Sequence, residues 1–348
     1  MLDLNLTPQQ EERAEALHNE SLIIDGLGGA LVHPEPPDDQ GRPYMDRLVE
    51  SNIRVANVTL VAHSKGFEDA CSEMFHYFNL FQVMPDRVLH VKTVADIERA
   101  IREKKVGIVF GFQSPTPVDK EFWRWTILYQ LGLRVCTLSY MEPNLMADGC
   151  MEPRNGGLTY YGIQAVTEMN RLGILVDLSH VGERSSLEAI EKSKKPCVFS
   201  HSNAKGVTPS NRNLTDEQIT AVAAKGGVVG LSPHGFMSHK TVGVQPTLSD
   251  FLDHFEYLQK LVGVDHIGLG SDIFEKPKLS WETTTKLFYN SPWIRETVLN
   301  RDYSKVQHVR NLTRGLVARG FSDEEIRKML GGNFLRVFKE VWREGSLT

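Results

Sequence analysis

The sequence has few cysteines and no paired cysteine motif. Four cysteines are scattered over 348 residues, and Cys136 and Cys197 lie in apolar, strand-like runs. No Cys-x-x-Cys pair is present, and the spacing does not indicate a disulfide framework. We therefore expect reduced thiols in a cytoplasmic protein.

Long apolar runs and an excess of positive charge are also missing. No run approaches the roughly 20 apolar residues that span a bilayer. The formal net charge is −5, and acidic and basic residues are interspersed, so no basic patch for nucleic acid or an anionic membrane is present. The first residues lack an apolar signal core and instead predict an amphipathic helix capped by Thr7. We expect neither nucleic acid nor a membrane among the partners.

Short apolar runs alternate regularly with amphipathic stretches, and no internal repeat is visible. The eight predicted strands are 22–25, 54–60, 107–112, 134–139, 174–178, 197–200, 228–231 and 266–270. The helical patterns include 119–131, 161–172, 183–194, 216–225 and 248–262. Apolar strands separated by helices favour parallel βα units, and eight such units in one chain fit a (β/α)8 TIM barrel of the α/β class.

The expected organisation is a single barrel domain over residues 1–348. Its composition, 41% hydrophobic, supports a large buried core. Additional helices are expected over about 7–19 at the N-terminus and about 306–345 at the C-terminus. A doubly wound open sheet is the alternative, but no Gly-x-Gly-x-x-Gly motif follows the first predicted strand. Chemistry in such barrels lies at the carboxyl ends of the strands, so the residues there are the candidates.

Two consecutive predicted strands end in the same dipeptide, Ser-His. The stretch VDLSHVGERSSLEAIEKSKKPCVFSHSNA places His180 after one strand and His201 after the next. The ends of neighbouring barrel strands lie side by side, so both imidazoles can converge on one point, as zinc sites require. A single histidine there is more often a hydrogen-bonded structural residue, whereas the matched pair favours a shared functional site.

A carboxylate follows the last predicted strand. The run HIGLGSD ends at Asp272, and the eighth strand closes the barrel against the first, so this carboxylate is expected at the barrel mouth. The alternative is a helix or turn cap, since Ser-Asp after a strand is also cap chemistry. With His180 and His201 it forms a set of two histidines and a carboxylate.

Three further polar residues are candidates for binding a substrate. Arg212 lies in the loop before a predicted helix start at Thr215, where it suits a bidentate contact with a carboxylate or phosphate. Its alternative is a surface ion pair. Gln113 and Tyr140 follow the third and fourth predicted strands, and either can donate a hydrogen bond to a substrate or an oxyanion.

Other histidines and aromatic residues give weaker signals. Isolated loop histidines are mostly solvated, which is the expectation for His33, His63 and His234. The segment 274–301 is rich in aromatic residues that either line the pocket or pack against the C-terminal helices, namely Trp281, Phe288, Tyr289 and Trp293.

From about residue 20 to 345 the sequence resembles the membrane (renal) dipeptidase family of the amidohydrolase superfamily. The motifs that carry the resemblance are LTYYGIQAVTEMNRLGILVDLSHVG, PCVFSHSNAKGV, RNLTDEQI, GGVVGLSP, HIGLGSD and GGNFLRVFKEVW. The resemblance implies a (β/α)8 barrel and a zinc dipeptidase, typically with two zinc ions bridged by a glutamate. It implies that His180 and His201 bind the second zinc, that Arg212 holds the terminal carboxylate, and that Asp272 lies near the substrate amine and the attacking water. A homodimer is expected by analogy.

The sequence departs from the family pattern around the first metal, as a divergent subgroup would. The His-x-Asp motif after the first strand is replaced by Leu27-Gly28-Gly29. The bridging glutamate is replaced by Gln113, and the histidine that stabilises the transition state is replaced by Tyr140.

These replacements limit the metal content. Two Zn²⁺ ions need anionic ligands to offset their repulsion and desolvation, and a glutamine offers only a neutral carbonyl oxygen. We therefore expect one zinc at most, bound by His180, His201 and Asp272 or a water, with an open position for catalysis.

The leading hypothesis is a metal-dependent hydrolase that cleaves an amide in a small carboxylate-bearing substrate, either a dipeptide or an N-acyl amino acid. Asp272 would bind or activate water, Tyr140 would polarise the carbonyl, and Gln113 and Arg212 would bind the substrate. The first alternative is a repurposed barrel that binds a small carboxylated ligand without hydrolysis. The second is a lyase or isomerase that uses His180 or His201 as acid and base.

Overall fold

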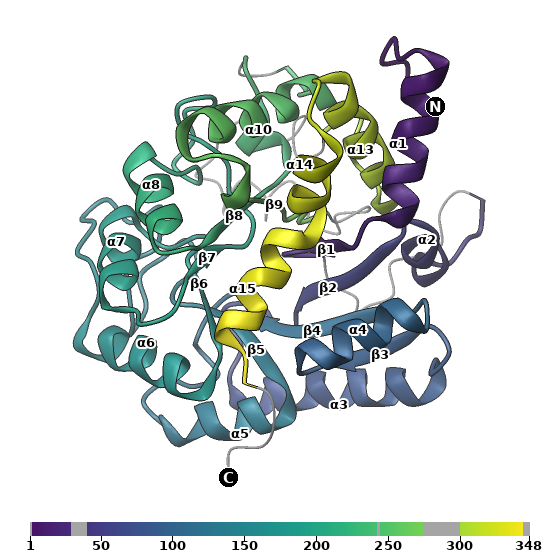
Figure 1. Cartoon of the computed structure of the whole chain (residues 1–348). Helices are drawn as coiled ribbons and strands as arrows, with labels where there is room; N and C mark the ends of the chain where they lie inside the picture. Colours follow the sequence, from purple (N-terminus) through teal and green to yellow (C-terminus); the bar gives the residue numbers. More distant parts are fainter. Residues whose placement is uncertain (1, 29–39, 242–243, 274–299, 344–348) are drawn as a thin grey trace.

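The computed structural model describes residues 2–28, 40–241, 244–273 and 300–343. Its parallel strands surround a central core, and helices lie around them (Figure 1). The strands are β1 (Ile23–Asp25), β2 (Ile53–Thr59), β3 (Val88–Val91), β4 (Val106–Phe112), β5 (Leu133–Thr137), β6 (Leu175–Asp177), β7 (Val198–Phe199), β8 (Val228–Leu231) and β9 (Ile267–Leu269). The predicted His33 and the four aromatic residues of 274–301 lie outside the described residues.

Eight of these strands form a closed parallel barrel, which confirms the (β/α)8 prediction. The order is β2-β1-β9-β8-β7-β6-β5-β4-β3, and a further pairing between β2 and β4 closes the ring. All eight predicted strands are present. The ninth, β3, was not predicted; it is a four-residue strand that pairs with the first part of β4 outside the ring.

The helices of the N-terminal half are α1 (Pro8–Glu20), α2 (Tyr44–Glu50), α3 (Phe67–Val83), α4 (Val94–Arg102), α5 (Trp123–Leu131) and α6 (Tyr160–Leu172). Those of the C-terminal half are α7 (Glu183–Lys192), α8 (Asp216–Ala224), α9 (Gly235–Ser238), α10 (Leu248–Val262), α13 (Val309–Ala318), α14 (Asp323–Arg327) and α15 (Asn333–Val341).

Local sequence explains where these helices begin. Thr7 caps α1 in a reciprocal arrangement with Gln10, and Thr215 does the same for α8. Helix α5 begins at Trp123, four residues later than predicted. Asp119 adopts a left-handed backbone conformation with φ 53°, which a right-handed helix does not contain, so the preceding residues form a turn.

The last helix closes the amino-terminal end of the barrel. A π-helical turn at Lys328–Gly332 leads into α15, which crosses the end of the strands (Figure 1). The buried ring of Phe334 enters the barrel, where glycines provide the space: a Cβ at Gly26 or Gly268 would lie within 2.6 Å of it. The carboxyl-terminal end of the barrel thus remains for chemistry.

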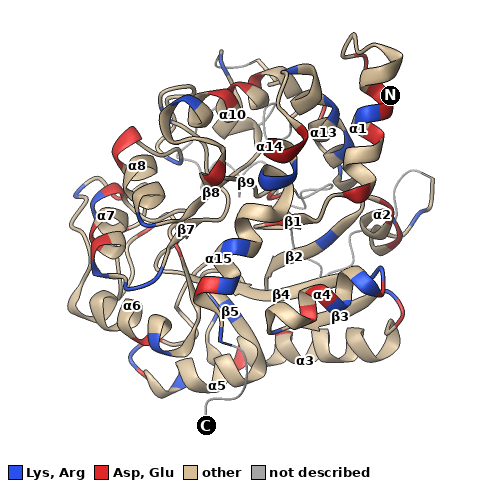
Figure 2. Cartoon of the chain, in the orientation of Figure 1, with Lys and Arg blue, Asp and Glu red and all other residues tan. Residues whose placement is uncertain are grey.

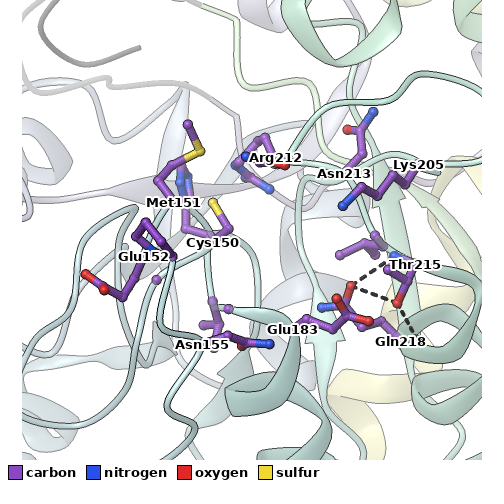
Figure 3. Close-up of a pocket in the computed structure, with 17 residues that line it drawn as sticks. Cys150, Met151, Glu152, Asn155, Glu183, Lys205, Arg212, Asn213, Thr215 and Gln218 are labelled. Carbon is purple, nitrogen blue, oxygen red and sulfur yellow. Dashed lines mark hydrogen bonds between the residues drawn. The ribbon is translucent and has the colours of Figure 1, made fainter. Parts of the chain in front are cut away.

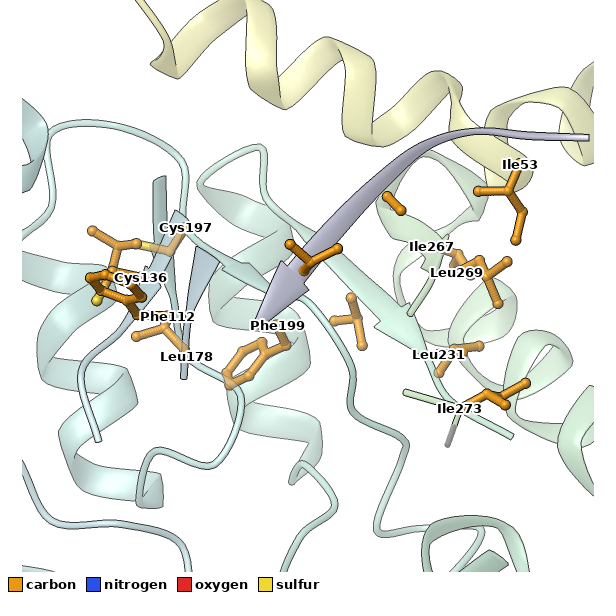
Figure 4. Packing of buried hydrophobic residues seen from close by; sticks show 14 of the residues in the cluster. Ile53, Phe112, Cys136, Leu178, Cys197, Phe199, Leu231, Ile267, Leu269 and Ile273 are labelled. Carbon is orange, nitrogen blue, oxygen red and sulfur yellow. The ribbon is translucent and has the colours of Figure 1, made fainter. Parts of the chain in front are cut away.

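Apolar side chains fill the space around the strands and beneath the outer helices. Figure 4 shows Phe199, Leu231 and Leu269 among them, and each is fully buried. Charged residues of both signs are spread over the outer helices, for example on α4 and α14 (Figure 2). No helix in the described ranges is long and apolar enough to cross a membrane.

A buried histidine on α1 forms hydrogen bonds with other parts of the chain and makes the free energy of unfolding depend on pH. His18 contacts the Thr313 hydroxyl at 3.0 Å and the Ser51 carbonyl at 3.1 Å. Burial, assisted by the charge of Arg310, lowers the pKa of His18 to about 4. The unfolded chain therefore binds the proton more strongly than the folded chain does. The contribution of neutral His18 to the free energy of unfolding is complete above about pH 6.5 and is lost as the pH falls toward 4.

We expect wild-type protein to lose about 2 kcal/mol more unfolding free energy than His18→Gln between pH 7.5 and pH 5. Urea unfolding of both proteins at the two pH values measures this difference. Equal pH dependence in the two proteins would mean that His18 does not control it.

Candidate active site

His180 and His201 meet at the carboxyl-terminal end of the barrel. They follow β6 and β7, and their Nε2 atoms lie 2.9 Å apart. Both side chains are almost completely buried. Burial and the nearby charge of Arg212 keep the pKa of each imidazole well below its usual value, so both rings are neutral near pH 7.

A hydrogen-bond chain orients His201. The Asp177 carboxylate accepts hydrogen bonds from the Ser179 and Ser200 N–H groups at 3.0 and 2.9 Å and from the Ser200 hydroxyl at 2.5 Å. Because that hydroxyl donates its proton to Asp177, it accepts from His201 Nδ1 at 2.7 Å. His201 therefore carries its proton on Nδ1 and presents the lone pair of Nε2 to the site.

The ring of His180 is held by stacking. It lies against the ring of Tyr140, with centroids 4.1 Å apart, and His63 stacks on the other side of Tyr140 at 4.3 Å. The His180 backbone has a left-handed φ of 69°, and its carbonyl accepts a hydrogen bond from Cys150 N–H at 2.6 Å. Its Nδ1 atom is buried without a hydrogen-bond partner, so this atom can form a hydrogen bond with a ligand.

Gln113 and Arg212 contact the same histidine. The Gln113 side-chain amide lies 3.2 Å from His201 Nε2. Arg212 donates from Nη1 to the Ser202 hydroxyl and from Nη2 to the His201 carbonyl, both at 2.7 Å, while its Nε atom is buried without a partner. The surface ion pair considered for Arg212 is therefore wrong, since this side chain is 3% exposed.

Asp272 lies beside the end of β1. Its backbone N–H donates to the Leu27 carbonyl at 2.8 Å, and its φ is 49°. Burial raises the pKa of the Asp272 carboxyl to about 7, against the opposing effect of Arg212. The Asp25 carboxylate accepts hydrogen bonds from the N–H groups of Leu27 and Ser271, and burial also raises its pKa to about 7.

The replaced motif after β1 is packed rather than open. Leu27 is buried, and a Cβ at Gly28 would lie 2.8 Å from that of Ala56. Gly28 therefore allows β1 and β2 to approach closely and leaves no extra room for a substrate; Gly29 lies outside the described residues.

A pocket of about 270 Å³ opens beside His180 and Arg212. Its walls are the 149–155 loop, the start of α7 and the loop that leads into α8 (Figure 3). A small molecule in this pocket would contact both the imidazole pair and the guanidinium group.

Some site residues were not predicted from the sequence. His63 and His234 were expected to be solvated, but His63 joins the ring stack and burial lowers the pKa of His234 to about 3. Asp177 and Ser200 were not singled out, although the repeated serine before each histidine was visible. Asp25 was interpreted only as a strand end.

Comparisons with known proteins agree with this architecture. Dipeptidase tcpJ of Claviceps purpurea (strain 20.1) is 27% identical over 281 residues, 80% of this chain and 61% of that protein. Dipeptidase verJ of Clonostachys rogersoniana is 31% identical over 264 residues, 75% of this chain and 62% of that protein. The matched region thus spans about three fifths of the length of these curated relatives.

A solved structure extends the comparison over almost the entire chain. An amidohydrolase from Pseudomonas aeruginosa is 31% identical and superposes with a TM-score of 0.84, covering 95% of this chain and 99% of that one. Residues 11–345 match the membrane dipeptidase family, peptidase family M19. The sequence motifs, the barrel and this match agree, and the chain belongs to the membrane dipeptidase family.

Proposed function

We propose that this protein is a hydrolase that cleaves an amide bond in a small carboxylate-bearing substrate, a dipeptide or an N-acyl amino acid. The proposal rests on the convergence of His180, His201 and Arg212 beside one pocket. This arrangement places two imidazoles next to a guanidinium group that can bind a carboxylate. Membership of the dipeptidase family and relatives named as dipeptidases support it.

We propose that the imidazole pair holds one zinc at most. The two neutral imidazoles converge through a 2.9 Å hydrogen bond between their Nε2 atoms, which a shared cation could replace. The Ser200–Asp177 chain supports the His201 tautomer that metal binding requires. In the described ranges no group of three or more His, Cys, Asp or Glu side chains is placed to hold a metal. Asp272 therefore stays a predicted third ligand, and buried Leu27 does not fit a first metal.

The proposed roles of the residues follow from their surroundings. A bound zinc would polarise the amide carbonyl and lower the pKa of water. Arg212 would hold the substrate carboxylate through its unpartnered Nε–H. Burial raises the pKa of the Tyr140 hydroxyl well above its usual value, so Tyr140 stays protonated and can donate to the developing oxyanion. Asp272, if it does not bind the metal, has a pKa suited to accepting a proton from the attacking water.

A second candidate function is binding of a small carboxylated ligand without hydrolysis. The observation in its favour is the missing third metal ligand in the described part of the chain. Stabilisation by such a ligand that EDTA does not change, together with no hydrolysis, would favour this function.

The test is cleavage of a panel of dipeptides and N-acyl amino acids by purified protein loaded with Zn²⁺ or Mn²⁺. We expect cleavage that EDTA removes and that His180→Ala lacks. If no member of the panel is cleaved at full metal loading, the proposed hydrolase is excluded.

Ser200 has a positioning role that a variant can isolate. Ser200→Ala removes the acceptor of His201 Nδ1–H and one partner of Asp177, so we expect the metal affinity to fall by about 10- to 100-fold. Ser72→Ala, at an exposed position of α3, is the matched control. Zinc titration with a competing chelator measures the effect, and equal affinities in the two variants would contradict the role of Ser200.

We propose a cytoplasmic protein, supported by the four cysteines, all of which are free thiols. A single barrel domain over 1–348 and a homodimer are proposed on the resemblance to the family.

A further inference from the structure

The pocket beside the imidazole pair carries charges that the proposed hydrolysis does not use. Its lining includes Arg212, Lys205, Glu152 and Glu183; in the view of Figure 3 Glu183 lies below Lys205 and Glu152 lies at the far left. Arg212 has its role in holding the terminal carboxylate, so Lys205 is the additional cation of the pocket.

Lys205 belongs to the same wall as Arg212. Its backbone N–H donates to the Leu214 carbonyl at 2.8 Å, which holds the two ends of the loop together. Ala204 also pairs with Leu214. The main chain of Lys205 therefore lies beside the residues that immediately follow Arg212, and the two cations face one pocket.

The ammonium group of Lys205 is available to a ligand. Within the described residues it has no ion-pair partner. Other cations around this pocket are already paired: Arg154 with Asp148 at 2.5 Å and Arg184 with Glu188 at 2.8 Å. Lys205 is therefore not part of the ion pairs that fix the surrounding loops.

Each of the two carboxylates has a partner in the backbone. Glu183 is the first residue of α7, whose N-terminus has no side-chain cap, so the helix end offsets the negative charge of Glu183. Glu152 accepts a hydrogen bond from the Arg154 backbone N–H at 3.3 Å. Arg212 lines the pocket, and its Nε–H is buried without a hydrogen-bond partner. Together these features favour an anionic ligand.

We propose that Lys205 selects substrates whose carboxyl-terminal residue has an acidic side chain. Arg212 holds the main-chain carboxylate and Lys205 holds the side-chain carboxylate. The substrate class is then a dipeptide or N-acyl amino acid that ends in glutamate or aspartate. The inference rests on the proposed function for the bond that is cleaved, but binding of the acidic residue does not require hydrolysis.

The test is calorimetric binding of L-glutamate and of its neutral isostere L-glutamine to the full chain. We expect wild-type protein to bind glutamate about fivefold more tightly, the size of a partly exposed ion pair. Lys205→Ala is expected to reduce this preference to about one. Lys194→Ala, which removes an exposed lysine before β7 at the other end of the barrel, is expected to keep it.

The preference for an acidic residue is then measured in catalysis, as the ratio of kcat/KM for Ala-Glu to kcat/KM for Ala-Gln. A glutamate preference that depends on Lys205, with no cleavage of either peptide, supports the pocket and excludes the proposed hydrolase. Cleavage of both peptides without a glutamate preference supports the hydrolase and overturns the role of Lys205. An unchanged preference in Lys205→Ala also overturns it.

Discussion

His201→Ala is expected to lower kcat/KM for amide cleavage by about 10³-fold. The variant removes one of the two imidazoles at the centre of the site and the partner of the Ser200 hydroxyl. Loss of the metal-dependent polarisation of the carbonyl is worth several kcal/mol, and about 4 kcal/mol corresponds to a thousandfold change in rate. Steady-state kinetics on the best substrate of the panel measures the effect.

The control is His76→Ala, since His76 lies on the exposed side of α3, away from the site. It is expected to retain the wild-type rate. Urea unfolding of both variants separates a lost site from a lost fold. A His201→Ala rate within threefold of the wild-type rate would contradict a catalytic role for the imidazole pair.

Arg212→Lys is expected to raise KM for substrates with a free terminal carboxylate by about 100-fold, with a smaller change in kcat. Lysine keeps the positive charge but loses the planar fork and at least one of the hydrogen bonds to Ser202 and the His201 carbonyl. A hydrogen bond between two charged groups is worth about 2–3 kcal/mol, which corresponds to this change in binding.

The readout that isolates this effect is the preference for Ala-Ala over its C-terminal amide. Wild-type protein is expected to prefer the free carboxylate, and Arg212→Lys is expected to lose most of that preference. Arg184→Lys, next in sequence to the pocket residue Glu183 and paired with Glu188, is the matched control. If Arg212→Lys keeps the wild-type preference, the carboxylate is held elsewhere.

Hydrophobic patterning predicted most of the barrel because most ring strands are short runs of predominantly apolar residues. The pattern did not predict β3, since four residues outside the ring do not differ from an apolar loop. The predicted start of α5 was also wrong, because the left-handed conformation of Asp119 depends on its surroundings.

The candidate site was predictable where one residue type recurs at matching positions. Two Ser-His pairs after neighbouring strands pointed to His180 and His201, which meet in the structure. The stack of His63 on Tyr140 joins loops that follow different strands, so no local pattern indicates it. The Asp177 network depends likewise on the pairing of β6 with β7.

The most direct test of the proposed site is the zinc content of the purified chain after loading and dialysis. Elemental analysis is expected to give no more than one zinc per wild-type chain and none for His180→Ala or His201→Ala. Two zinc ions per wild-type chain would contradict the proposed site, because buried Leu27 and neutral Gln113 could then not be the residues that exclude a first metal.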